Sequence, residues 1–268
     1  MGGYVHGYSG REAERLEDQA RTLEDLLHAD TGFLDDTEVL EVGCGTGAQT
    51  AALARRSIGA RITAVDLSAA SLAEAERRVL AEGLGNVRFV QADIRAAPFR
   101  PGSFDHVFVC FVLEHLPNPE AMLAALRALL RPSGTITVIE GDHGSIFFHP
   151  ESAAARAAIA CQVELQRRAG GDANIGRRLY PLLVDAGFEE VRVSPRMVYA
   201  DASRPAFAEG FTRRTFTAMI EGVREGSVAA GLATQDGFDA GIRALHRTAA
   251  EPDGVFLYTF FKATGCVA

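Results

Sequence analysis

The stretch Val39-Leu40-Glu41-Val42-Gly43-Cys44-Gly45-Thr46-Gly47-Ala48 combines a short apolar run, one acidic residue and three closely spaced glycines. The apolar run predicts a buried strand. Glycine has no Cβ atom and tolerates positive φ, so the turn that follows lets the backbone approach a ligand closely. The helix expected from Ala48 presents unpaired backbone N–H groups at its start. Together these features predict a nucleotide-type site at the carboxyl end of a first strand.

Beyond this stretch, short apolar segments alternate with amphipathic segments. Such alternation is typical of βαβ units and predicts a parallel sheet. Strands are expected at Glu38–Val42, Arg61–Asp66, Asn86–Gln91, Phe104–Phe111, Thr135–Glu140, Phe188–Met197 and Gly254–Ala263. Helices are expected at Ser9–Ala29, Ala48–Arg56, Ser68–Glu82, Asn118–Leu130, Glu151–Ala169, Arg177–Ala186, Pro205–Ala230 and Asp236–Ala250.

The pattern changes after the fifth expected strand. Gly141–Gly144 is expected to be a loop, because glycine-rich segments punctuate regular structure. The helices expected between Gly144 and Gly171 and between Ser203 and Ala250 exceed what crossover connections need. We therefore expect them to form a cap over the carboxyl end of the sheet.

The composition argues against several classes of protein. The chain has 268 residues, of which 47% are hydrophobic and 23% charged, enough for one large globular domain with a cap. Its net charge of −8 argues against a nucleic-acid partner, since phosphate backbones bind clusters of Lys and Arg. The four cysteines are far apart, so neither a disulfide framework nor a zinc site is expected.

The sequence also lacks the usual signals for membranes and export. No segment approaches the ~18 apolar residues of a membrane span. The polar start, Met1–Glu12, has no apolar core of a signal peptide. We therefore expect a cytoplasmic protein without a membrane partner, and the oligomeric state stays open.

The glycine motif alone leaves the nucleotide open. Gly43-x-Gly45-x-x-Ala48, followed by Asp66 about 20 residues later, also fits the dinucleotide fingerprint of an NAD(P)-dependent oxidoreductase. Three further features favour a different nucleotide. Glu41 lies two residues before the first glycine, Asp93 follows the third expected strand, and Leu113-Glu114-His115-Leu116 follows the fourth.

In this order and spacing, the features closely resemble class I S-adenosylmethionine-dependent methyltransferases of the small-molecule branch. The resemblance covers roughly residues 36 to 140. It implies a Rossmann-like α/β fold with a seven-stranded, mostly parallel sheet in the order 3-2-1-4-5-7-6, helices on both faces and a helical cap. It also implies a lid helix at 1–30, an S-adenosylmethionine-binding core at 31–145, and the rest of the core with the inserted cap at 146–268.

The resemblance assigns the cofactor to residues at the carboxyl ends of the first four strands. The glycines would pass under the methionine tail and ribose, and Asp66 would accept hydrogen bonds from both ribose hydroxyls. Asp66 could instead cap the next helix, a role that Ser68 suits better. Asp93 would bind the adenine amino group, with a turn-forming role as the alternative.

Other residues complete the expected cofactor site. Leu67 would pack on the adenine, and the carbonyl of Cys110 would lie beside the sulfonium. Tyr4 and Arg11 belong to the expected lid, with a frayed terminus as the alternative. The full set is Glu41, Gly43, Gly45, Gly47, Asp66, Leu67, Asp93, Ile94, Cys110, Tyr4 and Arg11.

Candidate catalytic residues follow the fifth expected strand and lie in the lid. His143 is the first candidate for an acceptor contact or a base, because an unperturbed imidazole titrates near neutral pH. The alternative is that it only binds a loop carbonyl. The full set is His143, Asp142, Glu140 and Tyr8. The spacing of the acidic and histidine residues fits no named metal motif, so no metal is expected.

The expected reaction is transfer of the methyl group of S-adenosylmethionine to an O, N, S or C atom of a small molecule, as in natural-product biosynthesis. In-line displacement would leave S-adenosylhomocysteine. One alternative enzyme cyclises the aminobutyrate arm of S-adenosylmethionine and releases methylthioadenosine. An NAD(P)-dependent oxidoreductase and a non-catalytic binding module are more remote alternatives.

Overall fold

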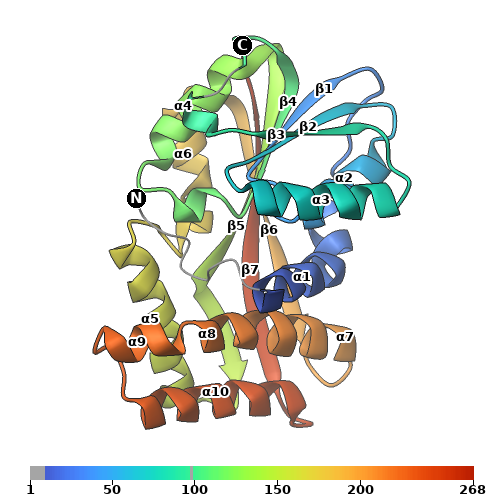
Figure 1. The fold of residues 1–268 in the computed structure, drawn as a ribbon. Coiled ribbons are helices and arrows are strands. Elements are labelled where there is room, and N and C mark those ends of the chain that lie inside the picture. Colours follow the sequence, from blue (N-terminus) through green and yellow to red (C-terminus); the bar gives the residue numbers. More distant parts are fainter. Residues whose placement is uncertain (1–9, 97–98) are drawn as a thin grey trace. The chain divides into compact units, whose positions relative to one another are not determined.

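The computed structural model describes residues 10–96 and 99–268. Its strands are β1 (Glu38–Val42), β2 (Arg61–Asp66), β3 (Val87–Gln91), β4 (Phe104–Cys110), β5 (Leu130–His149), β6 (Glu189–Ala200) and β7 (Val255–Cys266). They form one seven-stranded sheet in the order β3-β2-β1-β4-β5-β7-β6 (Figure 1). The pairs β1–β2, β1–β4, β2–β3 and β4–β5 are parallel. The predicted fold class and strand order are confirmed.

Helices lie between the strands, and those of the first half agree closely with prediction. The α-helices are α1 (Gly10–His28), α2 (Ala48–Arg56), α3 (Ala69–Ala81), α4 (Pro119–Leu129), α5 (Ala153–Arg168), α6 (Leu179–Asp185), α7 (Pro205–Phe207), α8 (Ala218–Gly222), α9 (Arg224–Ala229) and α10 (Gln235–Ala250). Short 3₁₀ turns are η1 (Ile94–Ala96), η2 (Leu113–His115) and η3 (Ile175–Arg178). The hydroxyl of Ser68 accepts a hydrogen bond from the N–H of Ser71 at 3.1 Å, which confirms the expected cap of α3.

The central strands are apolar because helices cover the sheet. Val107 and Val109 of β4 are fully buried, and they share one hydrophobic cluster with Leu123 and Leu126 of α4. Each such side chain contributes about 1.5–3 kcal/mol relative to an exposed one. This burial holds the strand ends in place and so positions the loops that follow them.

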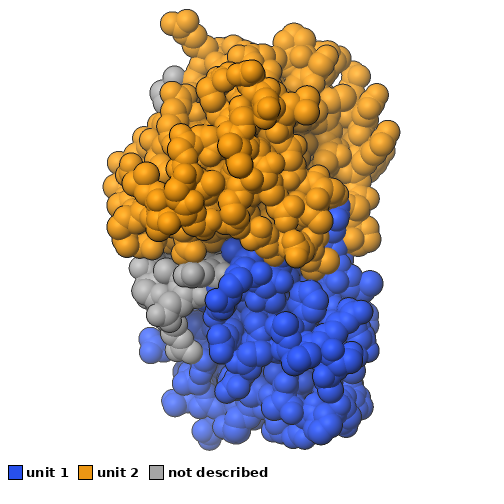
Figure 2. Space-filling view, turned by 90° about the vertical axis from the view of Figure 1, so that its right-hand side faces the viewer, with its two compact units in different colours: residues 1–23, 141–174, 196–260 blue, residues 24–140, 175–195, 261–268 orange. Residues whose placement is uncertain are grey.

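The chain forms two compact units, which Figure 2 colours separately. Unit 1 comprises Met1–Leu23, Gly141–Asn174 and Arg196–Phe260. Unit 2 comprises Glu24–Glu140, Ile175–Pro195 and Phe261–Ala268. The chain passes from one unit to the other within α1, β5, β6 and β7, and between Asn174 and Ile175. The division into lid, core and cap at 1–30, 31–145 and 146–268 stays a prediction.

The predicted loop at Gly141–Gly144 is wrong, because β5 continues through it to His149. Buried Ile146 and Phe148 flank exposed Phe147, which is the two-residue period of a strand. This alternation outweighs the turn signal of the glycines. Arg131–Gly134, between the predicted helix and the predicted fifth strand, forms an irregularity within β5, where Ser133 has a φ of 62° and the register to β4 shifts.

The helical structure predicted over Pro205–Ala230 is confirmed, but not as one continuous helix. The segment is divided into α7, a π-helical stretch η4 (Ala208–Thr217), α8 and α9. The hydroxyls of Thr215 and Thr217 donate to the carbonyl oxygens of Gly210 and Thr212, five residues earlier, at 2.8 and 2.7 Å. Apolar periodicity predicts a helix here but does not distinguish these local windings.

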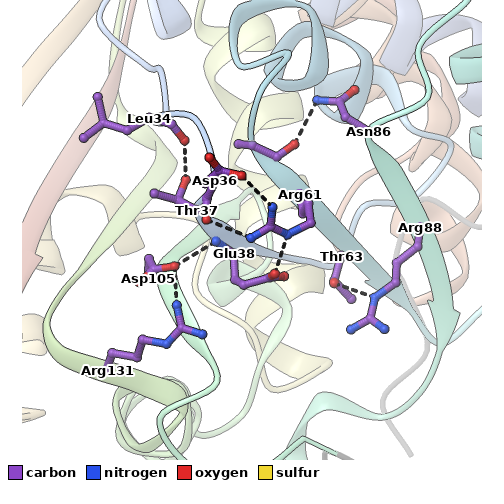
Figure 3. A network of polar contacts seen from close by, with 11 residues as sticks. Leu34, Asp36, Thr37, Glu38, Arg61, Thr63, Asn86, Arg88, Asp105 and Arg131 are labelled. Carbon is purple, nitrogen blue, oxygen red and sulfur yellow. Dashed lines mark hydrogen bonds and ion pairs between the residues drawn. The ribbon is translucent and has the colours of Figure 1, made fainter.

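An ion-pair network lies at the amino ends of β1, β2 and β4 (Figure 3). Arg61 donates to Glu38 Oε1 at 2.6 Å and to Asp36 Oδ1 at 3.2 Å. Asp105 Oδ2 accepts from the backbone N–H of Glu38 at 2.8 Å and from Arg131 at 2.5 Å. Exposed pairs contribute only ~0–1 kcal/mol each. The network therefore serves mainly to align the strand starts, at the edge opposite the carboxyl ends.

Acid is expected to destabilise the protein through His28. Burial, with a smaller effect of Lys262, lowers the pKa of His28 from 6.5 to about 4, and its Nε2 lies 2.6 Å from Gln49 Oε1. Below pH 6.5 the unfolded chain takes up this proton first, so the free energy of unfolding falls as the pH is lowered towards 4. The loss approaches ~3 kcal/mol at 1.36 kcal/mol per pKa unit.

Urea unfolding between pH 7.5 and 4.5 measures this effect. A His28→Gln variant is expected to lose most of this pH dependence, because glutamine does not titrate. The matched control is His149→Gln, since His149 is exposed. An unchanged slope in the His28 variant would contradict the assignment.

Candidate functional site

The glycine-rich turn after β1 adopts the backbone that its sequence predicts. Gly43, Gly45 and Gly47 have φ values of 69°, 52° and 77°, in the left-handed region that favours glycine. The N–H groups of Gly43 and Cys44 both donate to the carbonyl oxygen of Val65, at 2.8 and 3.0 Å. The turn is therefore tied to the end of β2, its neighbour in the sheet.

The three glycines have different surroundings. A Cβ atom on Gly43 would lie 2.6 Å from Val112 Cγ2, and one on Gly47 would lie 2.7 Å from Ala75. These two glycines allow close packing within unit 2. A Cβ atom on Gly45 would meet no atom of the described residues within 4 Å. Gly45 thus lies against open space, which a ligand can occupy.

Asp66 ends β2 directly beside this turn. Its Oδ2 accepts a hydrogen bond from the N–H of Gly45 at 2.8 Å, and its Oδ1 accepts from the N–H of Ser68 at 2.9 Å. A carboxylate has about four lone-pair sites, so both oxygens can accept further bonds. The hydroxyl of Ser68 caps α3, as described above. The carboxylate of Asp66 is therefore not needed as that cap and bonds the glycine turn.

Leu67 follows β2, and Asp93 and Ile94 follow β3, at the same carboxyl edge of the sheet. The side chain of Leu67 is 60% exposed although it is apolar, while Ile94 is buried. Asp93 is paired with the guanidinium of Arg95 through both oxygens, and this pairing lowers its pKa. Asp93 is therefore ionised and held by Arg95, which the sequence analysis does not single out.

Glu41 is a buried acid just before the turn. Its side chain is 2% exposed, and burial followed by Asp66 raises its pKa from 4.5 to about 7, although the hydroxyl of Thr50 acts in the opposite direction. Its Oε2 makes no hydrogen bond to any described residue. A buried oxygen without a partner is costly, so a bound cation or donor here would be favourable.

The turn after β4 carries a strained residue. Phe111 has a φ of 58°, which is rare for a bulky side chain and is a form of strain found at functional sites. Glu140 Oε1 accepts from the N–H groups of Val112 and Leu113 at 3.0 and 2.7 Å, while its Oε2 has no partner among the described residues. Burial and Glu114 raise the pKa of Glu140. The observed contacts of Glu140, a predicted catalytic residue, thus hold the turn after β4 in place.

Cys110 ends β4 and lies next to this turn. Its pKa is raised by burial and then by Glu140, Glu41 and Glu114. Its thiol is therefore protonated at neutral pH.

In unit 1, Asp142 and His143 are buried in the second half of β5. Asp142 Oδ1 accepts from the N–H of Gly144 at 2.9 Å. His143 donates its backbone N–H to Ala173 at 3.0 Å, and its Nδ1 lies 3.1 Å from the hydroxyl of Tyr258 in β7. Tyr258 escapes sequence analysis because it is 115 residues from His143. Only the pairing of strands brings it close.

The side chains of the predicted lid residues are not among those that the structure describes. Tyr4 and Tyr8 lie outside the described residues, and Arg11 is described only as part of the backbone of α1. Their predicted roles stay predictions. In the described part of the chain, no three His, Cys, Asp or Glu side chains are grouped as a metal site requires. No helix there is both long enough and apolar enough to cross a membrane.

Comparisons with known proteins agree with this geometry. Residues 39–134 match a family model described as a methyltransferase domain. The chain is similar to the trans-aconitate 2-methyltransferase of Deinococcus radiodurans, at 35% identity over 157 residues that cover 58% of this chain and 55% of that protein. It is also similar to the ubiquinone biosynthesis O-methyltransferase of Paracidovorax citrulli, at 33% identity over 128 residues, 45% of this chain and 53% of that protein.

A solved structure extends the likeness to most of the fold. The cyclase SpnF superposes with a TM-score of 0.56 at 19% identity, covering 93% of this chain and 81% of that one. At this identity the match shows the fold alone. The two methyltransferases named above are covered by this chain over about half of their length.

The sheet order, the glycine turn and the acid that ends β2 are those of the class I, Rossmann-like methyltransferase fold. Residues 39–134 carry a methyltransferase domain, which agrees with the predicted S-adenosylmethionine-dependent methyltransferase. S-adenosylmethionine, rather than NAD(P), is the nucleotide of this family.

Proposed function

We propose that the protein transfers the methyl group of S-adenosylmethionine to a small molecule. Bound S-adenosylmethionine supplies a methyl group that its sulfonium already activates. The observation that carries the proposal is the open space against Gly45, next to the carboxylate of Asp66. There the protein can approach a nucleoside with its backbone and offer acceptors to hydroxyl groups.

The residues around the glycine turn have proposed roles in holding the cofactor. Asp66 binds the ribose hydroxyls, and exposed Leu67 covers the adenine. Asp93, ionised beside Arg95, accepts from the adenine amino group. Glu41 offers its Oε2, which bonds no described residue, to the ammonium of the methionine tail, because a cation favours the ionised carboxylate. Ile94, Cys110, Tyr4 and Arg11 complete the proposed set.

For the acceptor we propose a pocket in unit 1. It has a volume of about 390 Å³, in the range of small-molecule sites. Its lining includes His143 and Asn174, which can hydrogen-bond, and Ile146, Phe148 and Ile159, which are apolar. This combination suits a small metabolite or natural-product intermediate with a polar group at one end. We propose His143 as its contact, with Asp142, Glu140 and Tyr8 supporting the reaction.

Product analysis tests the proposed reaction. The protein is incubated with S-adenosylmethionine alone and then with a pool of metabolites, and adenosyl products are identified by mass spectrometry. S-adenosylhomocysteine is expected, with formation that depends on the pool. Methylthioadenosine as the only product would instead show cyclisation of the aminobutyrate arm and would contradict methyl transfer.

A further inference from the structure

Tyr258 and His143 form a buried pair in unit 1. The hydroxyl of Tyr258 lies 3.1 Å from His143 Nδ1, and the two rings meet edge to face at 79° with centroids 5.6 Å apart. The side chains are 3% and 7% exposed. A hydrogen bond at this depth is shielded from water, so it decides which ring nitrogen carries the proton.

Several contacts hold the pair in one arrangement. The rings of Phe211, Phe216 and Phe260 pack on Tyr258 with centroids 5.5, 5.8 and 4.7 Å away. The backbone of His143 is bonded to Ala173, as noted above. In addition, a Cβ atom on Gly141 would lie 2.2 Å from the Tyr258 hydroxyl, so this glycine leaves the space that the hydroxyl needs.

The chemistry of the two groups sets the direction of the hydrogen bond. A phenol keeps its proton at neutral pH, with a pKa near ~10, and donates it readily. An unprotonated imidazole nitrogen is a good acceptor, whereas an imidazole N–H is a weak acid. The favoured arrangement is therefore O–H of Tyr258 donating to Nδ1 of His143. Neutral His143 then carries its proton on Nε2.

We propose that Tyr258 is a positioning residue that fixes His143 as the Nε2–H tautomer. His143 then donates a hydrogen bond to the methyl acceptor and does not remove its proton. This role rests on the proposed function only in that His143 faces the acceptor. The tautomer itself is a property of the protein and does not depend on any reaction.

Nuclear magnetic resonance of the full chain labelled with ¹⁵N-histidine tests the proposal. Protonated and unprotonated ring nitrogens have well-separated shifts, and a His143→Gln variant identifies the signals of His143. At pH 7.5 we expect an unprotonated Nδ1 and a protonated Nε2. A protonated Nδ1 in the unaltered protein would overturn the proposal.

Two variants test the role of the hydroxyl. Tyr258→Phe removes it, and Gly141→Ala displaces it while leaving both partners intact; each is expected to shift His143 towards a mixture of tautomers. The control is Tyr180→Phe, because Tyr180 is exposed. In the methyl-transfer assay, both variants should lose about tenfold in kcat/KM, as loss of one neutral hydrogen bond predicts.

The outcomes separate this proposal from the proposed function. Tautomer signals that do not respond to either variant would overturn the role of Tyr258, whatever the activity. Methylthioadenosine as the only product would contradict methyl transfer, while the expected tautomer would still stand. The spectrum of the unaltered protein decides the tautomer even where a variant fails to fold.

Discussion

Replacing Gly45 with valine is expected to weaken binding of S-adenosylmethionine by at least about 100-fold, which corresponds to ~2.7 kcal/mol. The valine side chain would occupy the open space next to the Gly45 backbone, where the nucleoside is proposed to lie. Its Cβ would meet no atom of the described part of the chain within 4 Å. The folded protein should therefore tolerate it apart from backbone strain of ~1–2 kcal/mol at positive φ.

Gly83 provides the matched control for that strain. It follows α3 with a φ of 71°, and a Cβ atom there would also meet no atom of residues 10–96 or 99–268 within 4 Å. Gly83→Val should lower the free energy of unfolding about as much as Gly45→Val does, by ~1–2 kcal/mol, and leave affinity unchanged. Titration calorimetry and urea unfolding measure the two quantities. Equal affinity of both variants for S-adenosylmethionine would show that Gly45 does not contact the cofactor.

Replacing Glu41 with glutamine is expected to stabilise the protein at pH 8.5 and to weaken cofactor binding. The pKa of Glu41 is raised from 4.5 to about 7, so the folded state holds this proton more tightly than the unfolded chain does. That contribution to stability is present below pH 4.5 and is lost as the pH rises through 7. Glutamine does not titrate, so the gain at pH 8.5 approaches ~3 kcal/mol and vanishes near pH 4.5.

The loss of affinity follows from the charge. Without the carboxylate of Glu41, the ammonium of S-adenosylmethionine loses its proposed partner, and the dissociation constant should rise about tenfold or more. Glu38→Gln is the control, because Glu38 starts the same strand and pairs with Arg61 at the opposite edge. It should change stability by only ~0–1 kcal/mol and leave affinity unchanged. Stabilisation without loss of affinity would show that Glu41 does not contact the cofactor.

Much of the candidate site can be predicted because its parts are local. Gly43, Gly45 and Gly47 lie within one turn, and Asp66 follows the neighbouring parallel strand. The carboxyl ends of parallel neighbours meet at one edge, so strand order is enough to bring these residues together. The hydrogen bond from Gly45 to Asp66 is the result.

Other features depend on contacts that no sequence pattern marks. The path of β5 beyond Glu140 is one, because its glycines indicate a turn while Ile146 and Phe148 indicate a strand. The π-helical stretch η4 is another, since apolar periodicity does not separate it from an α-helix. Glu140 shows a third case: its contact with the turn after β4 depends on the packing of two strands.

The sequence by itself determined the alternation of strands and helices and the glycine turn with its acid, because these follow from local backbone preference and the period of apolar residues. The strand order and the class of domain were implied by the resemblance to class I methyltransferases. The tertiary structure decided which groups are buried and therefore how they titrate, as at Glu41 and His28. It also decided the pairing of His143 with Tyr258. Burial and long-range pairing come from the packing of distant segments, and packing is a property of the whole fold.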